Sequence, residues 1–437
     1  MLSVSRISVV ALTLHSVLRV QGESFISSHR LLINQSLPIW PVSWYMPVPR
    51  EEPYCMRIFI SAGEPSGDLH GSNFAKALKA ACPTVTIDGF GGCKLVEAGQ
   101  HQVYPLAEHP IMGIWRAVKA VPHFYRIFRM AKQHFETHRP DAVVLVDYPG
   151  FHWHLAKAAH QRGIPVYWFV PPQIWAWATH RVKWMKKSVD HVFCNLPFET
   201  EWYQKKGMPC SFIGHPYFDA MSQQRLDESF IYEQRSRPER IVALLPGSRG
   251  HEVQDNVPMM LNAARLVHQQ VPDTRFLVAG FKTKQAEVIR EQLVNYPELP
   301  IEVHVGRTPE IINLATVCLS VSGSVSLELL NASLPTVTVY KIGQILFRLV
   351  SIFKHAKYIS LINLLADCVV TPEFLTNKDE SKPMSEQLIA WLKDEPSRLV
   401  VKQQMQQIKA GIARPGACQR AVEHLLSTLQ TRGKAAA

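Results

Sequence analysis

A glycine-containing strand-to-helix turn carries the strongest local chemical signal in the sequence. Residues 244–250 read LLPGSRG and join an apolar strand to a helix that continues through Glu252. Backbone N–H groups at such a turn and at the start of the following helix bind anions, and the forked guanidinium of Arg249 suits a diphosphate. The turn therefore predicts a pyrophosphate site made by Gly247, Ser248 and Arg249. An ordinary turn with a surface arginine explains the same residues about equally well.

A second turn follows another apolar strand further along the chain. Ser322, Gly323 and Ser324 lead into a helix that places Glu328 in its first turn. A carboxylate in that position can accept hydrogen bonds from both ribose hydroxyls of a nucleotide. Complementing the helix dipole is the more common use of such a glutamate, so both interpretations stay open.

The first predicted strand of the chain ends in a turn that contains two glycines, a serine hydroxyl and two carboxylates. This segment, GEPSGD, has its chemically useful side chains and glycines at Gly63, Glu64, Ser66, Gly67 and Asp68. The carboxyl end of a first strand is the usual ligand crevice of an open α/β sheet, although the pattern is not GxGxxG. A substrate contact and a helix cap are equally good interpretations of Asp68.

Asp147 is the candidate general base. It ends an apolar strand, where a carboxylate has little structural use unless it faces a crevice. Capping and turn roles are the alternative. His152 and His154 follow, but their spacing and the lack of matching acidic or cysteine partners do not make a metal site. We therefore expect no metal.

An amphipathic stretch from residue 111 to residue 134 alternates apolar bulk with basic side chains. This mixture suits the interface of an anionic bilayer, and an amphipathic helix pair packed on the sheet explains it equally well. Pro122 is expected to start a second helix in this stretch, and residues 345–357 repeat the same mixture. The predicted membrane contacts are Met112, Trp115, Val118, Phe124, Arg126, Phe128 and Arg129.

The elements that must position these residues follow an alternating strand–helix pattern, which predicts an α/β fold with two doubly wound domains. Each strand is a short apolar run followed by a turn or helix. The predicted strands are 57–61, 142–146, 166–170 and 191–194 in the first half, and 241–245, 275–279, 318–321 and 336–340 in the second.

Composition shifts predict the domain boundaries. Residues 56–225 form the first domain, 226–380 the second, and 381–437 are helices that pack back across the domains, with a polar connector at 219–240. Residues 1–55 lack periodicity and are rich in proline. We interpret them as an extension upstream of the true start at Met56, or as a targeting segment.

Composition limits the class of protein. The 437 residues are 47% apolar and 19% charged, a balance that is typical of a packed globular protein. The net charge of +11 suits nucleic acid, anionic lipid or a phosphorylated substrate, and does not choose among these partners. No RNP motif or zinc-finger spacing is present, so we expect no nucleic acid. The eight cysteines form no CxxC pair and are interpreted as reduced. No apolar run is long enough to span a bilayer, so membrane contact would be peripheral.

Together these motifs resemble the lipid-A-disaccharide synthase family, and the likeness runs from about Met56 to the region of Cys418. Nine segments occur in the family's order. They are GEPSGD at 63–68, MGIW at 112–115, VDYPGF at 146–151, PPQIWAWATHRVK at 171–183, LPFE at 196–199, FIGHP at 212–216, LPGSRGHEV at 245–253, SGSVSLE at 322–328 and YISLINLL at 358–365.

The resemblance implies a GT-B architecture, in which two Rossmann-like domains face a cleft. It also implies metal-independent, inverting transfer of 2,3-diacylglucosamine from UDP-2,3-diacylglucosamine to 2,3-diacylglucosamine 1-phosphate, without a cofactor. The enzyme would work on the cytoplasmic face of the inner membrane, peripherally bound to its anionic surface. A homodimer is left open.

Matching positions imply roles for individual residues. Asp147 corresponds to the family's proposed base, Arg249 to the arginine on the leaving diphosphate, Glu328 to a ribose contact and Asn363 to a nucleotide contact. The chain departs from the family at Ile362, Asp367, Cys368 and Thr376, which lie near the predicted donor contacts of the C-terminal region.

Two rival interpretations remain. One is another UDP-sugar enzyme of the same fold, such as a lipid-linked N-acetylglucosaminyl transferase or a UDP-sugar epimerase; the WAW segment at 175–177 and the MGIW segment at 112–115 argue against it. The other is a non-catalytic, membrane-associated binding protein, which the intact motifs around Asp147 and Arg249 make improbable.

Overall fold

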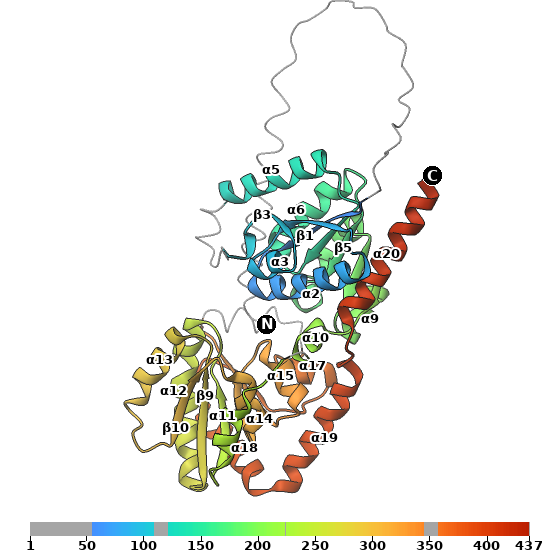
Figure 1. The fold of residues 1–437 in the computed structure, drawn as a ribbon. Coiled ribbons are helices and arrows are strands. Elements are labelled where there is room, and N and C mark those ends of the chain that lie inside the picture. The colour runs from blue at the N-terminus through green and yellow to red at the C-terminus, as the bar shows by residue number, and fades with distance from the viewer. Residues whose placement is uncertain (1–54, 109–120, 223, 345–356, 437) are drawn as a thin grey trace, which may run out of the picture.

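The structure is a computed structural model that describes residues 55–108, 121–222, 224–344 and 357–436. Figure 1 shows two lobes, each built on a parallel sheet with helices packed against it. The prediction of two doubly wound α/β domains is confirmed.

The first lobe contains a seven-stranded parallel sheet in the order β3-β2-β1-β4-β5-β6-β7. All five side chains of the central strand β4, AVVLV, are buried, as expected for a parallel sheet covered on both faces. The strands are β1 (Arg57–Ala62), β2 (Thr86–Phe90), β3 (His101–Tyr104), β4 (Ala142–Val146), β5 (Val166–Phe169), β6 (His191–Cys194) and β7 (Cys210–Phe212).

Helices follow the strands of this sheet and bury apolar side chains against it. Phe74 and Leu78 of α2 pack with Ile58 and Ile60 of β1 in one core cluster. The helices are α2 (Pro65–Ala81), α3 (Cys93–Glu97), α5 (Val121–Thr137), α6 (Pro149–His160), α7 (Ile174–Trp177), α8 (Val182–Ser188), α9 (Pro197–Lys205) and α10 (Pro216–Ser222).

The second lobe contains a six-stranded parallel sheet in the order β10-β9-β8-β11-β12-β13. Its strands are β8 (Arg240–Leu245), β9 (Thr274–Gly280), β10 (Ile301–Val305), β11 (Val317–Val321), β12 (Thr336–Lys341) and β13 (Glu373–Thr376). Its helices are α11 (Glu228–Arg235), α12 (Gly250–Gln270), α13 (Thr283–Leu293), α14 (Thr308–Leu314), α15 (Val325–Ala332) and α17 (Leu361–Ala366).

Three C-terminal helices return across the lobes, as Figure 1 shows in red. They are α18 (Ser381–Lys393), α19 (Glu395–Ile412) and α20 (Ala417–Ala436). Met384 and Leu388 of α18 join the core of the second lobe. Val422 and Leu425 of α20 join that of the first lobe. The chain therefore ends on the lobe in which its described part begins.

All eight predicted strands are present, with ends that differ from the prediction by no more than one residue. One local expectation, that the helix after the first strand starts near Leu69, was wrong. Helix α2 begins at Pro65 rather than near Leu69, because a proline at the first helical position is already preset for the helix. Within the polar connector, α11 forms, and Asp227 caps that helix by accepting a hydrogen bond from the backbone of Phe230. The expected helix start at Pro122 is confirmed by α5.

Both sheets have the strand order of a dinucleotide-binding fold, with a reversal between β1 and β4 and again between β8 and β11. In open parallel sheets, ligands bind beyond the carboxyl ends of the strands at such a reversal. The fold thus marks one crevice on each lobe before any side chain is considered.

Candidate active site

The four turns that sequence analysis selected lie at these two reversals. Residues 63–68 follow β1 and Asp147 follows β4, while residues 247–249 follow β8 and residues 322–324 follow β11. Glu64 and Arg249 are close enough to interact electrostatically, so the turn after β1 and the turn after β8 approach each other from different lobes. The arrangement forms a single candidate site between two sheets.

Asp147 is held in an unusual backbone conformation at the end of β4. Its φ is +47° and that of Tyr148 is +48°, a left-handed region that side chains other than glycine rarely adopt. The buried ring of His152 supports this turn: Nδ1 lies 2.8 Å from the Asp147 carbonyl oxygen and Nε2 lies 2.9 Å from the Ser61 hydroxyl. Backbone strain of this kind clusters at functional sites.

His152 is best described as a neutral structural support. Burial lowers its pKa to about 3, so the ring is uncharged at neutral pH. A neutral ring has one donor nitrogen, and the carbonyl of Asp147 can only accept. Nδ1 therefore donates to that carbonyl and Nε2 accepts from Ser61, which fixes the tautomer. Among the described residues, no cluster of three or more His, Cys, Asp and Glu side chains could hold a metal ion.

Asp147 has two acidic neighbours. Burial and then the nearby charge of Glu64 raise the pKa of Asp147 to about 7. Burial also raises the pKa of Glu64, although Arg249 acts in the opposite direction. Glu199 lies at the start of α9, is fully buried, and has a pKa raised to about 8, chiefly by burial. A carboxylate with a pKa near neutrality can exchange protons at physiological pH.

Glu199 was not assigned a role from the sequence. One carboxylate oxygen accepts a hydrogen bond of 3.1 Å from the indole of Trp175, and the other is buried without a hydrogen-bond partner among the described residues. The ring of Trp175 also packs edge-on against Phe198, with centroids 4.9 Å apart. Both residues lie in family-like segments, PPQIWAWATHRVK and LPFE, which gave the only sequence signal for them.

Gly63 is required by the close approach of Tyr148. A Cβ at position 63 would lie 2.2 Å from the Tyr148 ring, so no larger residue fits without moving that side chain. Ser66 is exposed in the first turn of α2, and Gly67 is buried beside β4. The close approach of Gly63 and Tyr148 therefore keeps the predicted acceptor-side turn compact.

Asp68 has a structural role that differs from the predicted substrate contact. Its carboxylate accepts hydrogen bonds from the backbone N–H groups of Gly92, Lys94 and Leu95, at 2.7, 3.1 and 3.3 Å. These groups are the unpaired donors at the N-terminus of α3, which Asp68 caps from the neighbouring helix. The side chain is buried, and its acceptors are directed at that helix.

The turn after β8 is ordered by one carboxylate. Glu252 accepts a 2.7 Å hydrogen bond from Nη1 of Arg249 and a 3.3 Å bond from the Arg249 backbone N–H, which closes a capping box at the start of α12. Gly247 has a φ of +107°, and a Cβ there would lie 2.8 Å from Oε2 of Glu252. Ser248 is exposed, and its carbonyl accepts a 2.9 Å hydrogen bond from Gln285.

Arg249 remains accessible in this arrangement, with 34% of its side chain exposed. It lies at the N-terminus of the 21-residue helix α12, whose dipole favours an anion. A guanidinium and a helix N-terminus together provide the positive charge and the donors that a diphosphate needs.

The turn after β11 supplies Glu328. Gly323 has open space around its Cα and Ser324 is exposed, whereas the Ser322 hydroxyl donates a 2.8 Å hydrogen bond to the Ile359 carbonyl and is structural. Glu328 accepts a 2.8 Å hydrogen bond from the hydroxyl of Tyr217, a residue that sequence reasoning missed.

Asn363 is fully buried, and this differs from the predicted nucleotide contact. Its Nδ2 donates to the Thr371 carbonyl and to Glu373, and its Oδ1 accepts from the backbone of Val370 and Thr371. The amide is thus occupied in ordering the segment that leads into β13.

The predicted membrane contacts divide into three groups. Met112, Trp115 and Val118 lie outside the described residues. Phe124 does not reach the surface, because it is 7% exposed and its ring packs 5.5 Å from that of Phe151. Arg126 and Arg129 are exposed, and Phe128 is half-buried.

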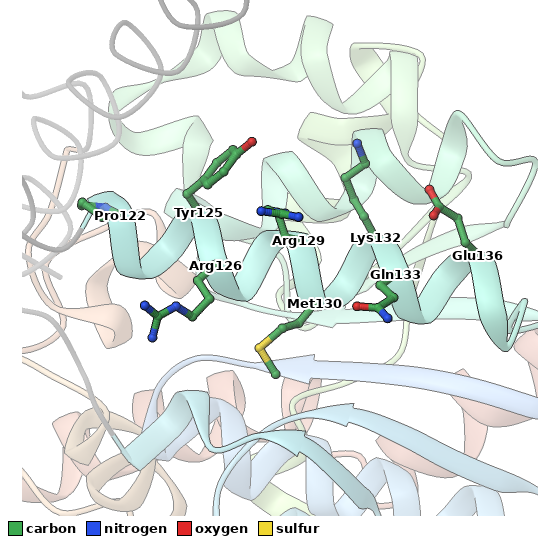
Figure 2. Close-up of a pocket in the computed structure, with 8 residues that line it drawn as sticks. All are labelled: Pro122, Tyr125, Arg126, Arg129, Met130, Lys132, Gln133 and Glu136. Atoms are coloured by element: carbon green, nitrogen blue, oxygen red, sulfur yellow. The ribbon is translucent and has the colours of Figure 1, made fainter.

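Helix α5 borders a surface hollow of about 750 Å³, shown in Figure 2. The side chains of Arg126, Arg129 and Lys132 lie along it with the half-exposed ring of Tyr125. Glu136 is the acidic residue among those that line it, and it pairs with Arg162. The hollow is therefore basic with an aromatic edge. In the described part of the chain, no helix is long and apolar enough to cross a membrane.

Two Rossmann-like lobes, each with a reversal of strand order in its parallel sheet, define the GT-B fold class. Solved structures support this class. They include the Staphylococcus aureus MnaA–UDP co-structure (TM-score 0.60, 13% identity, covering 86% of this chain and 97% of that chain). Another is MurG of Acinetobacter baumannii (TM-score 0.54, 13% identity, covering 85% and 99%). At these identities the likeness establishes the fold.

Sequence comparison identifies the family. The lipid-A-disaccharide synthetase family model matches residues 58–425. A lipid-A-disaccharide synthase of Trichlorobacter lovleyi is 32% identical over 378 residues, 86% of this chain and 98% of that protein. Lipid-A-disaccharide synthase 1 of Legionella pneumophila strain Paris is 34% identical over 325 residues, 74% and 84% of the two chains. The chain belongs to the lipid-A-disaccharide synthetase family, and it is a glycosyltransferase.

Proposed function

We propose that the chain transfers 2,3-diacylglucosamine from UDP-2,3-diacylglucosamine to the 6-hydroxyl of 2,3-diacylglucosamine 1-phosphate, with inversion at the sugar. The products are the β(1→6)-linked disaccharide 1-phosphate and UDP. The observation that carries the proposal is that Glu64 is close enough to interact electrostatically both with Asp147 of its own lobe and with Arg249 of the other lobe.

On the donor side, Arg249 and the N-terminus of α12 bind the diphosphate of the UDP-sugar. When the bond from the sugar C1 to the diphosphate oxygen breaks, the bonding electrons leave with UDP. The guanidinium and the helix dipole stabilise this growing negative charge. Glu328 accepts hydrogen bonds from the ribose hydroxyls.

On the acceptor side, Asp147 takes the proton of the 6-hydroxyl as that oxygen forms its bond to C1. A pKa of about 7 suits this step, because a base near the ambient pH combines an adequate ionised fraction with proton affinity. One displacement with one base inverts the sugar, so no covalent sugar–enzyme intermediate is required.

We further propose that α5 contacts the anionic cytoplasmic face of the inner membrane, where the acyl chains of both substrates reside. The basic hollow at Arg126, Arg129 and Lys132 supports this, since several exposed cations attract an anionic surface. A homodimer stays a prediction, to be checked by analytical ultracentrifugation of the full chain.

Product analysis tests the function. The full chain is incubated with UDP-2,3-diacylglucosamine and 2,3-diacylglucosamine 1-phosphate, and in parallel with UDP-N-acetylglucosamine as donor. Mass spectrometry should detect a tetraacylated disaccharide monophosphate in the first reaction alone. Transfer or epimerisation of unacylated UDP-N-acetylglucosamine at a comparable rate would instead favour the rival UDP-sugar enzymes.

A further inference from the structure

Tyr217 connects the two lobes at the candidate nucleotide site. It lies on α10, just beyond the last strand of the first sheet, and its hydroxyl donates a 2.8 Å hydrogen bond to Oε1 of Glu328 on α15 of the second lobe. The two residues are 111 positions apart in the sequence. No role for Tyr217 follows from the catalytic steps described above.

Neighbouring contacts on both sides fix the position of Tyr217. The next residue, Phe218, is 4% exposed and packs in a cluster with Leu327 and Leu330 of α15. Asp219 accepts backbone hydrogen bonds of 2.7 and 3.1 Å from Gly416 and Cys418 at the start of α20. Helix α10 is thus anchored to the second lobe by packing and to the C-terminal helix by hydrogen bonds.

The ring of Tyr217 is also supported from the first lobe. The backbone N–H of Tyr217 donates a 3.2 Å hydrogen bond to Nδ1 of His215. The rings of His215 and His70 lie 6.4 and 6.5 Å from its centre, and both histidines are buried. His70 belongs to α2, the helix that begins in the Gly63–Asp68 turn. Tyr217 therefore lies between α2 of the first lobe and the Glu328 carboxylate of the second lobe.

The contact with Tyr217 determines which oxygen of Glu328 is free to bind a ligand. The side chain is half-buried, and burial raises its pKa while the Tyr217 hydroxyl acts in the opposite direction. With Oε1 engaged by Tyr217, the rotation of the carboxylate is restricted and Oε2 is the oxygen left for a ribose hydroxyl. A carboxylate that is oriented before binding loses less entropy when the ligand arrives.

We propose that Tyr217 is a positioning residue for the donor: its hydroxyl, held between the lobes, orients the Glu328 carboxylate toward the ribose hydroxyls of the UDP-sugar. The inference rests on the proposed function, in which Glu328 binds ribose, and adds a residue that acts through Glu328 rather than on the sugar.

The test is UDP binding by the full chain, measured by isothermal titration calorimetry with UDP and with 2′,3′-dideoxy-UDP. Tyr217→Phe removes the hydroxyl and keeps the ring. We expect UDP to bind about threefold to tenfold more weakly, as for loss of one hydrogen bond, and 2′,3′-dideoxy-UDP to bind as before. In turnover assays the KM for the donor should rise while kcat stays nearly constant.

Tyr232→Phe is the matched control, because Tyr232 is 79% exposed on α11. It should leave both affinities unchanged. Equal weakening of UDP and dideoxy-UDP by Tyr217→Phe, or no change in either, would overturn the positioning role.

Glu328→Gln distinguishes the role of Tyr217 from the ribose contact of Glu328 on which it rests. It also provides a test if Tyr217→Phe fails to fold. We expect Glu328→Gln to weaken UDP but not dideoxy-UDP, with Tyr217→Phe adding little in that background because the two act as a unit. Additive effects would refute the coupling alone. Unchanged UDP binding by Glu328→Gln would refute the ribose contact and the role of Tyr217 with it, while the transfer reaction is still judged by its product.

Discussion

Replacing Asp147 with asparagine should stabilise the protein, and the gain should increase with pH. Asparagine has nearly the same shape but cannot ionise, so it removes the cost of placing a carboxylate beside Glu64 in a largely buried turn. The variant would lose its base and be inactive, because active-site residues are often kept for activity at a cost in stability.

The size of the effect follows from the pKa of Asp147, which burial and the charge of Glu64 raise from 3.8 to about 7. Above pH 3.8 the unfolded chain loses this proton, while the folded chain keeps it until about pH 7. Stability from the protonated group is therefore present at low pH and is lost as pH rises through this interval. From pH 5 to pH 7 the loss is at most about 2.7 kcal/mol, at about 1.4 kcal/mol per pH unit. Asp147 is only half-buried, so we expect about 1 kcal/mol.

Urea denaturation of the full chain at pH 5 and pH 8 measures this difference. Asp88→Asn is a control of opposite sign. Burial acts to raise the pKa of Asp88, but hydrogen bonds from His134 and Arg57 outweigh it and hold the pKa below its usual value. That variant should be destabilised at both pH values. An Asp147→Asn gain that is the same at pH 5 and pH 8 would refute the raised pKa.

Three further predictions concern charge. Glu64→Gln should move the acidic limb of the kcat/KM–pH profile to lower pH, by about half a unit to one unit, because it removes a negative charge that raises the pKa of Asp147; an unmoved limb would exclude Glu64 as the cause. Glu199→Gln should raise the urea midpoint by an amount that grows from pH 5 to about pH 8, since the folded wild-type carboxyl keeps its proton up to its pKa of about 8 whereas the unfolded carboxyl loses its proton near 4.5; a difference in midpoint that does not change with pH would contradict the raised pKa. Arg126→Glu with Arg129→Glu should weaken sedimentation with anionic vesicles severalfold at low salt, with neutral vesicles as the control; unchanged sedimentation would remove α5 from the membrane contact.

The sequence predicts the central strands well and the edge strands poorly. Apolar runs such as 142–146 are buried on both faces, so their composition alone indicates a parallel strand. The unpredicted strands β3, β7, β10 and β13 lie at the edges of the two sheets and are partly exposed. Three of them are only three or four residues long, whereas the alternating sequence of β10, IEVHV, is a pattern that could have been found. Strand β2 is interior but contains Asp88, which is buried through its contacts with Arg57 and His134. Those partners are invisible to local periodicity.

The site shows the same division. The positions of Asp147 and Arg249 just after strand ends could be predicted from the apolar runs that precede them, and topology places such strand ends where ligands bind in open sheets. The contact of Tyr217 with Glu328 could not be predicted, since it joins residues that are 111 positions apart in the sequence. For Asp68 and Asn363, residue type alone cannot distinguish capping and loop-ordering hydrogen bonds from ligand contacts.

The measurement that most directly tests the account is UDP release from UDP-2,3-diacylglucosamine, with and without 2,3-diacylglucosamine 1-phosphate. It is made on the wild-type chain, Asp147→Ala and Arg249→Ala, with UDP binding followed by calorimetry in each. We predict release that depends on the acceptor and is lost in both variants, with UDP binding retained by Asp147→Ala and weakened by Arg249→Ala. Acceptor-dependent release that survives Asp147→Ala would contradict the assignment of the base, and a folded, UDP-binding wild-type chain that releases no UDP would contradict the proposed reaction.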